Sequence, residues 1–441
     1  MVVIETDPRF QPEKAYCFRV IFGELLGLEY CVDWRPEEKN YRLRLPNGSS
    51  IVVEDHFWGQ LSESFQLSES SMPQRAETSP SYFDGSPLTA IFGTNQFIFS
   101  ETEIRCGLDV FASVFFMLTR WEEFVSRERD THGRFPAEKA LACKAGFLDR
   151  PVVNEYAELL RQMFARLGWQ PPRPKRRFSM TVTCDVDRPR LWWSAADRLR
   201  TLGGCILRRG DFREAGFWLK NHIFRQKDPY DVFDEWLDLF EKNGLTGHFN
   251  FLGKRPPSSD CWYPLEHPFI VKLIRKIAAR GHVTGFHPSY EAFGDAGLFR
   301  QELESLQAVS PAPVTSGRQH YLRFAAPHTW QMWEDAGMDW DSTMGYPEAE
   351  GFRCGICQDF PVFNFLTRQT LRLREKPLLA MDVTLALYRK YTPETAFERL
   401  QQLRKQVEKH SGEFVLLWHN SSWNTYFWAP WREVFISFIT Q

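Results

Sequence analysis

Two aspartates separated by one residue, Asp185 and Asp187, are the first candidates for chemistry in this sequence. An apolar, β-branched stretch leads into them and Arg188-Pro189 ends it, which is typical of a strand that carries both carboxylates at its carboxyl end. The two side chains then lie on one face, roughly 6–7 Å apart. A divalent metal on one carboxylate would leave the other as a base. The alternative is a strand that ends in acidic turn residues.

Other polar side chains fall at or near the ends of further predicted strands. They are His287, His320, Asp341 and His419. Each taken alone is more often structural than catalytic, but the carboxyl ends of parallel strands meet at one edge of a sheet. One carboxylate with two imidazoles is a common ligand set for a catalytic zinc or similar ion that keeps an open position for water. The sequence therefore predicts a metal-dependent site at this edge.

The elements that must position these residues begin after a proline-rich basic run at residues 171–177. Strands are predicted over 178–183, 248–252, 282–286, 318–324, 338–342, 378–383 and 414–418. Helices are predicted over 230–243, 269–280, 297–308, 329–336 and 393–409. About seven β/α units of this kind indicate an α/β fold with a parallel sheet, open or closed into a barrel.

The first 170 residues predict a smaller α+β domain. Short strands and turns are predicted between residues 18 and 53, and helices over 108–125 and 152–167. No metal or nucleophile constellation is visible in this part, and its role is not predicted. The predicted domains are therefore residues 1–170, a linker at 171–177, and residues 178–441.

Composition excludes several classes of protein. The formal net charge is −2, so no overall field selects nucleic acid or an anionic membrane. No window approaches about 18 uninterrupted apolar residues, so no integral membrane segment is expected. The N-terminus lacks a basic region followed by an apolar one, and nine irregularly spaced cysteines suit a reducing compartment. A cytoplasmic location is therefore predicted, whereas the oligomeric state is not.

Four motifs occur in an informative order. They are Thr183-Cys-Asp-Val-Asp187, Gly281-His-Val-Thr-Gly-Phe-His-Pro-Ser289, Asp341-Ser-Thr343 and Leu416-Leu-Trp-His419. In this order the region from about 178 to 431 resembles the polysaccharide deacetylase (NodB-homology) family. The resemblance implies a distorted (β/α)7-type barrel that removes acetyl groups from sugars. It also implies one divalent metal ion, Zn²⁺ first, with Co²⁺, Mn²⁺ or Ni²⁺ as alternatives. Segments 111–121 and 130–154 resemble the domain that precedes this barrel in a bacterial subgroup.

The resemblance implies a role for each matching residue. Asp185 matches the catalytic base, Asp187 and His287 match metal ligands, and His419 matches the general acid that protonates the leaving group. The family's second histidine ligand lies four residues after the first, and this sequence has Glu291 there.

Two assignments stay open. We favour His320 as the third ligand because it lies at the end of the next predicted strand, with Glu291 or no third protein ligand as alternatives. The family's arginine that orients the base has three candidates, Arg318, Arg323 and Arg353.

The predicted function is the metal-dependent removal of an acetyl group from an N- or O-acetylated saccharide, such as a surface-polysaccharide precursor. One alternative is a non-catalytic carbohydrate-binding or assembly protein on the same barrel, because the second histidine ligand is missing. Another is a metal-dependent amidase that acts on a non-sugar C–N bond. The expected partner is an acetylated saccharide rather than nucleic acid.

Overall fold

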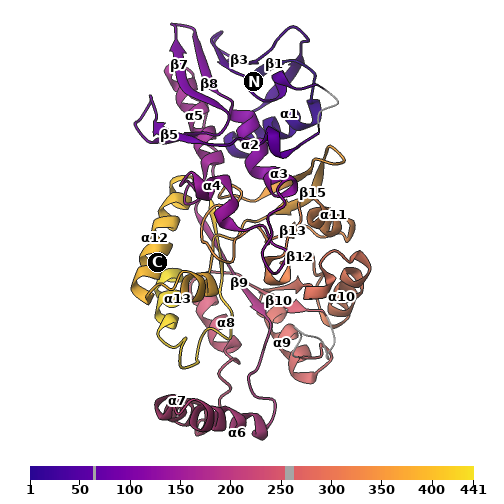
Figure 1. Cartoon of the computed structure of the whole chain (residues 1–441), viewed down its shortest axis with the longest axis vertical. Helices are drawn as coiled ribbons and strands as arrows, with labels where there is room; N and C mark the ends of the chain where they lie inside the picture. Colours follow the sequence, from indigo (N-terminus) through magenta and orange to yellow (C-terminus); the bar gives the residue numbers. More distant parts are fainter. Residues whose placement is uncertain (63–65, 254–262) are drawn as a thin grey trace.

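The structure is a computed structural model that describes residues 1–62, 66–253 and 263–441. Figure 1 shows an elongated molecule with the N-terminal part at one end and a larger α/β body in the middle. A helical arm with α6 (Ala195–Gly203) and α7 (Phe212–Trp218) lies at the other end. Within these residues, no helix is both long enough and apolar enough to cross a bilayer.

The N-terminal part contains a six-stranded mixed sheet and a separate strand pair. The large sheet has the order β2 (Tyr30–Trp34), β1 (Val2–Thr6), β3 (Tyr41–Arg44), β4 (Ser50–Val53), β8 (Glu103–Leu108) and β7 (Gly93–Phe99). The pair is β5 (Glu77–Pro80) with β6 (Pro87–Ala90). The helices are α1 (Gln11–Phe18), α2 (Val110–Thr119), α3 (Trp121–Val125), α4 (Leu141–Lys144) and α5 (Val152–Arg166).

The single helix predicted over 108–125 is wrong, because the structure has two helices there. Arg120 separates α2 from α3 with a φ of 53°, a left-handed conformation that ends a helix. In this conformation its buried guanidinium lies 3.1 Å from the Glu122 carboxylate and 2.9 Å from that of Glu123. A buried charge needs such partners, and the periodicity of the apolar residues does not reveal them.

The body is built on a nine-stranded sheet. Its order is β14 (Phe360–Asn364), β15 (Gln369–Glu375), β13 (Trp340–Asp341), β12 (Ser316–Gly317), β11 (Val283–His287), β10 (Gly247–Leu252), β9 (Ser179–Val186), β17 (Glu413–Leu417) and β16 (Ala380–Met381). Neighbouring strands are parallel except for β14, which pairs antiparallel with β15. The helices are α8 (Phe233–Lys242), α9 (Pro268–Ala279), α10 (Ala296–Val309), α11 (His328–Asp335), α12 (Pro393–Lys409) and α13 (Trp431–Ile439).

The predicted α/β class and parallel sheet are confirmed, and the helix over 393–409 has the predicted bounds. The strand predicted over 318–324 is wrong. Strand β12 ends at Gly317, and a short 3₁₀ turn, η8 (His320–Leu322), follows. In the described chain the end strands β14 and β16 do not pair with each other, so closure into a barrel stays a prediction.

The N-terminal part and the body share one continuous hydrophobic core. The ring of Tyr16 lies 5.0 Å from that of Phe363, and the ring of Phe115 lies 5.6 Å from it. Arg353 of the body donates to the Glu123 carboxylate at 2.6 and 2.9 Å. Apolar contact and a buried ion pair thus join the two parts, while the division into domains at 171–177 stays a prediction.

Candidate metal centre

The carboxyl ends of four parallel strands carry the predicted site residues. Asp185 is the penultimate residue of β9 and Asp187 follows that strand. His287 is the last residue of β11, His320 begins η8 three residues after β12, and His419 lies two residues after β17. Because these strands run parallel, the sheet places all five residues at the same edge.

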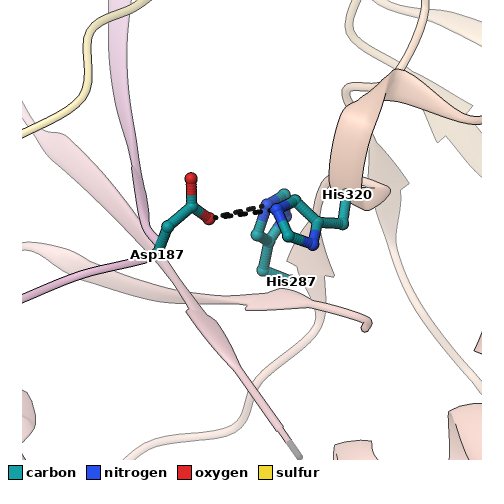
Figure 2. Close-up of side chains that lie close together, drawn as sticks. All are labelled: Asp187, His287 and His320. Carbon is teal, nitrogen blue, oxygen red and sulfur yellow. Dashed lines mark ion pairs between the residues drawn. The ribbon is translucent and has the colours of Figure 1, made fainter. Parts of the chain in front are cut away.

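Three of these side chains form a possible metal-binding group, shown in Figure 2. The Asp187 Oδ1 atom lies 3.5 Å from His287 Nε2 and 3.4 Å from His320 Nε2. One ligand atom from each residue lies within 4.8 Å of the other two. Asp187 Oδ1 is buried and accepts no hydrogen bond, which is unusual for a buried carboxylate oxygen. An unsatisfied oxygen that faces two imidazole nitrogens fits a divalent cation of the zinc class.

Of the three possibilities for the third ligand (His320, Glu291 or no protein ligand), the structure places His320 in this group. Glu291 is exposed on the 3₁₀ turn η7 (Tyr290–Ala292) and is not a member of it.

A backbone contact fixes the orientation of the His287 ring. Its Nδ1 atom lies 2.6 Å from the backbone oxygen of Arg318. A carbonyl oxygen accepts hydrogen bonds and cannot donate them, so Nδ1 must carry the proton. In the neutral ring this leaves the lone pair on Nε2, the atom that faces Asp187, which is the arrangement typical of a histidine ligand.

The pKa shifts within the group have opposite signs for the acid and the base. Burial alone would raise the pKa of Asp187, but the nearby His320 and His287 more than offset this and lower it. Burial alone would lower the pKa of His287, but Asp185 and Asp187 raise it. The carboxylates thus create a negative potential that favours positive charge between them and the imidazoles, and a divalent cation can supply that charge.

Asp185 is held from one side by two donors. Its Oδ1 atom accepts from Arg318 Nη1 at 3.0 Å and from Asn250 Nδ2 at 2.7 Å, while its Oδ2 atom lies 3.9 Å from His287 Nε2. Arg318 is fully buried and also donates to Thr183 Oγ1. Burial would raise the pKa of Asp185, but the Arg318 guanidinium and the nearby histidines lower it. The carboxylate therefore stays ionised at neutral pH.

Of the three candidate arginines, Arg318 contacts Asp185, whereas Arg323 and Arg353 have other partners. Arg353 donates to Glu123 and to the backbone oxygen of Gly345. Because these buried contacts hold its guanidinium away from Asp185, the geometry does not support the catalytic role considered for Arg353.

His419 lies on another side of Asp187, with its Nε2 atom 3.9 Å from Asp187 Oδ2. Its Nδ1 atom pairs with Asp382 Oδ1 at 2.8 Å, and its backbone N–H donates to Asp382 Oδ2. Burial would lower the pKa of His419, but Asp382 and the two site aspartates raise it to about 9. The ring is therefore protonated at neutral pH. Sequence reasoning missed Asp382, although it directly follows the end of β16, the same signal that identified the other residues.

Asp341, another strand-end candidate, belongs to a buried carboxyl pair instead. Glu375, also fully buried, accepts from Trp330 Nε1 at 2.9 Å and from the backbone N–H of Met344. Burial raises the pKa of Asp341 to about 7 and raises that of Glu375 well above its usual value. The folded protein therefore binds protons that the unfolded chain has released at neutral pH.

This carboxyl pair predicts a stability that falls as pH rises. The pKa of Asp341 is higher in the folded protein than in the unfolded chain. Its contribution to the free energy of unfolding is therefore fully present below about pH 4 and is lost as the pH rises from there through about 7. We expect the free energy of unfolding in urea to decrease between about pH 4.5 and 7, and Asp341→Asn to remove most of that decrease. An unchanged slope in this variant would contradict the assignment.

The site opens into a cavity of about 200 Å³. Its lining includes all five predicted residues, the apolar side chains of Met381 and Leu417, and Arg134 from the N-terminal part. The N-terminal part thus contributes directly to this cavity, although its sequence shows no cluster of metal-ligating or nucleophilic residues.

Arg134 restrains the turn that carries His320. Its Nη1 atom donates to the backbone oxygen of Tyr321 at 2.9 Å, while its Nε atom donates to Asp130 at 2.7 Å. Tyr321 and Leu322 have φ values of 59° and 54°, and two consecutive left-handed residues of this kind persist where surrounding contacts hold them.

We therefore expect Arg134→Ala to weaken metal binding about tenfold, because a less restrained turn holds His320 less well. Affinity can be measured by competition with a chelating dye, and Arg134→Lys should restore part of it. The matched control is Arg150→Ala, because Arg150 also bonds a carboxylate (Glu155) and a backbone oxygen (Pro87) but lies within the N-terminal part. Equal affinities in Arg134→Ala and Arg150→Ala would contradict the positioning role.

Comparison with known proteins gives three results. The model of a family of unknown function (DUF7033) matches residues 2–168. No curated protein matches the chain. Among solved structures, one described as a "putative polysaccharide deacetylase" from Mycobacterium smegmatis is 16% identical, with a TM-score of 0.39 over 61% of this chain and 85% of that chain.

A second solved structure, a family 4 carbohydrate esterase from Streptomyces lividans in complex with acetate, is 8% identical. Its TM-score is 0.29, over 60% of this chain and 88% of that chain. Likenesses as weak as these two establish neither a shared fold nor a shared activity.

Proposed function

We propose that this protein is a metal-dependent hydrolase that removes an acetyl group from an N- or O-acetylated saccharide. The observation that supports this proposal most directly is the group formed by Asp187, His287 and His320, with an ionised carboxylate and a protonated imidazole beside it. A site that binds metal without catalysis has no need of Asp185 and His419, so their placement favours an enzyme over a binding protein.

Each residue has a distinct task in the proposed mechanism. A divalent ion held by Asp187, His287 and His320 would polarise the acetyl carbonyl and acidify a water molecule. Asp185, fixed by Arg318 and Asn250, accepts the proton of the attacking water on its Oδ2 atom.

The second proton transfer belongs to His419, which gives its Nε2 proton to the departing nitrogen or oxygen. Asp382 fixes the ring through Nδ1 and keeps it protonated until that step. General acid or base groups of this kind typically contribute 10²–10⁴-fold each.

The choice of substrate rests on the resemblance of the motifs to the deacetylase family, and so do the closed barrel and the identity of the ion. The cytoplasmic location rests on the sequence pattern alone. A metal-dependent amidase that acts on a non-sugar C–N bond would use the same groups, so the two candidates differ in substrate rather than in chemistry.

The decisive experiment measures acetate release. The full chain is stripped with a chelator, reloaded with Zn²⁺, Co²⁺, Mn²⁺ or Ni²⁺, and incubated with N- and O-acetylated saccharides and with simple non-sugar amides. We expect acetate release from a saccharide that requires added metal. Hydrolysis of the amides alone would favour the amidase, and no turnover with any metal would contradict both enzymes.

A further inference from the structure

The helical arm, residues 191–227, extends from the body at the end opposite the N-terminal part (Figure 1). It consists of α6, the π-helical segment η5 (Gly204–Arg208), α7 and a second π-helical segment, η6 (Leu219–Ile223). The arm has a small core of its own, built on Trp192, Cys205, Ala215 and Trp218 and separate from the main core. The outer side chains of the arm are those that this small core leaves exposed.

These outer side chains are unusually apolar. Leu199, Leu207, Phe212 and Phe224 are between 70% and 85% exposed, and Trp193 and Ile206 are exposed as well. The arm thus holds six of the sixteen large apolar side chains that are exposed among the described residues. Exposed apolar side chains concentrated in this way mark an interaction surface.

The same arm is strongly basic. Residues 191–227 contain eight Arg and Lys against three Asp and Glu, a formal charge of +5, so the remainder of the chain carries −7. Most of the basic side chains, including Arg208, Arg213 and Arg225, are exposed. A helix surface that mixes exposed apolar and basic side chains is typical of elements that lie in the interface of an anionic bilayer.

We propose that the arm binds the surface of an anionic membrane. Leu207, Phe212 and Phe224 enter the boundary between headgroups and acyl chains, while the basic side chains pair with lipid phosphates. The charge distribution supports this occupant, because an anionic surface attracts the arm and repels the remainder of the chain. The arm begins four residues after Asp187, so it follows directly from the strand end that carries the candidate metal centre.

The test uses the purified full chain and sedimentation with vesicles. We expect binding to vesicles of phosphatidylcholine with phosphatidylglycerol, much weaker binding to phosphatidylcholine alone, and weakening with added salt. Combined Leu207→Ser, Phe212→Ser and Phe224→Ser substitutions should abolish binding. Each of Arg208→Gln, Arg213→Gln and Arg225→Gln should lower it about fivefold.

Two controls make the result specific. One carries serine at three exposed apolar positions elsewhere, Ile98, Leu366 and Leu387, and should bind as the wild type does. The other is Asp187→Ala, which should also bind normally, because the proposed membrane contact does not depend on metal or catalysis.

Two results would overturn the proposal. The first is an absence of binding to the anionic vesicles, or binding that the arm substitutions leave unchanged. The second is a dimer in analytical ultracentrifugation that the three serine substitutions in the arm dissociate, because the apolar surface would then be an interface between two copies of the chain.

Discussion

Asp187→Ala should abolish stoichiometric binding of a divalent metal, with affinity falling by more than about 100-fold. Partners that only orient a metal ligand typically cost 10–100-fold when removed, so the loss of a ligand should cost more. Asp187 also supplies the carboxylate that faces both imidazoles at 3.4–3.5 Å, and without it the two rings have no anionic partner between them. Equilibrium dialysis followed by elemental analysis measures both stoichiometry and affinity.

Two further variants separate this prediction from its alternatives. His320→Ala should lose affinity in the same range, whereas Glu291→Ala should bind metal as the wild type does, because Glu291 is exposed outside the group. Strong binding in Asp187→Ala, or a larger loss in Glu291→Ala than in His320→Ala, would contradict the proposed ligand set. Circular dichroism would confirm that the variants remain folded.

The juxtaposition of Asp187, His287 and His320 could be predicted because a parallel sheet brings the carboxyl ends of its strands together. Each residue directly follows or lies near the end of a strand, so an approximate list of strands was sufficient to place it. The strand predicted through His320 was wrong, yet His320 still falls at the same edge because β12 ends three residues earlier. Errors of a few residues in element bounds do not change which edge a side chain reaches.

The partners of these residues could not be predicted in the same way. Sequence reasoning left Arg318, Arg323 and Arg353 as competing candidates, because the family's arginine has no unique match in this sequence. In the structure the body buries the guanidinium of Arg318 against Asp185, whereas the guanidinium of Arg353 binds Glu123 of the N-terminal part. Contacts between residues more than 100 positions apart leave no local pattern.

The left-handed turn after His320 and the basic arm were missed for different reasons. Tyr321 and Leu322 have no intrinsic preference for positive φ, so their conformation depends on contacts such as the one from Arg134. The basic arm was missed because only the net charge of the whole chain, −2, was considered. That value does not show the formal charge of +5 on residues 191–227. The charge of this segment, together with the exposure of its side chains in the structure, indicates an interaction surface that the composition of the whole chain does not indicate.

Asp185→Asn should lower the rate of acetate release by 10²–10⁴-fold while it leaves metal affinity within about threefold of the wild type. The asparagine oxygen can still accept from Arg318 and Asn250, so the packing is preserved, but an amide does not accept a proton at neutral pH. Because Asp185 is not a member of the metal-binding group, affinity and rate separate in this variant, whereas they fall together in Asp187→Ala. A full rate in Asp185→Asn would exclude Asp185 as the base. A parallel loss of metal would instead make Asp185 a ligand, and the base would then have to be sought elsewhere around the cavity.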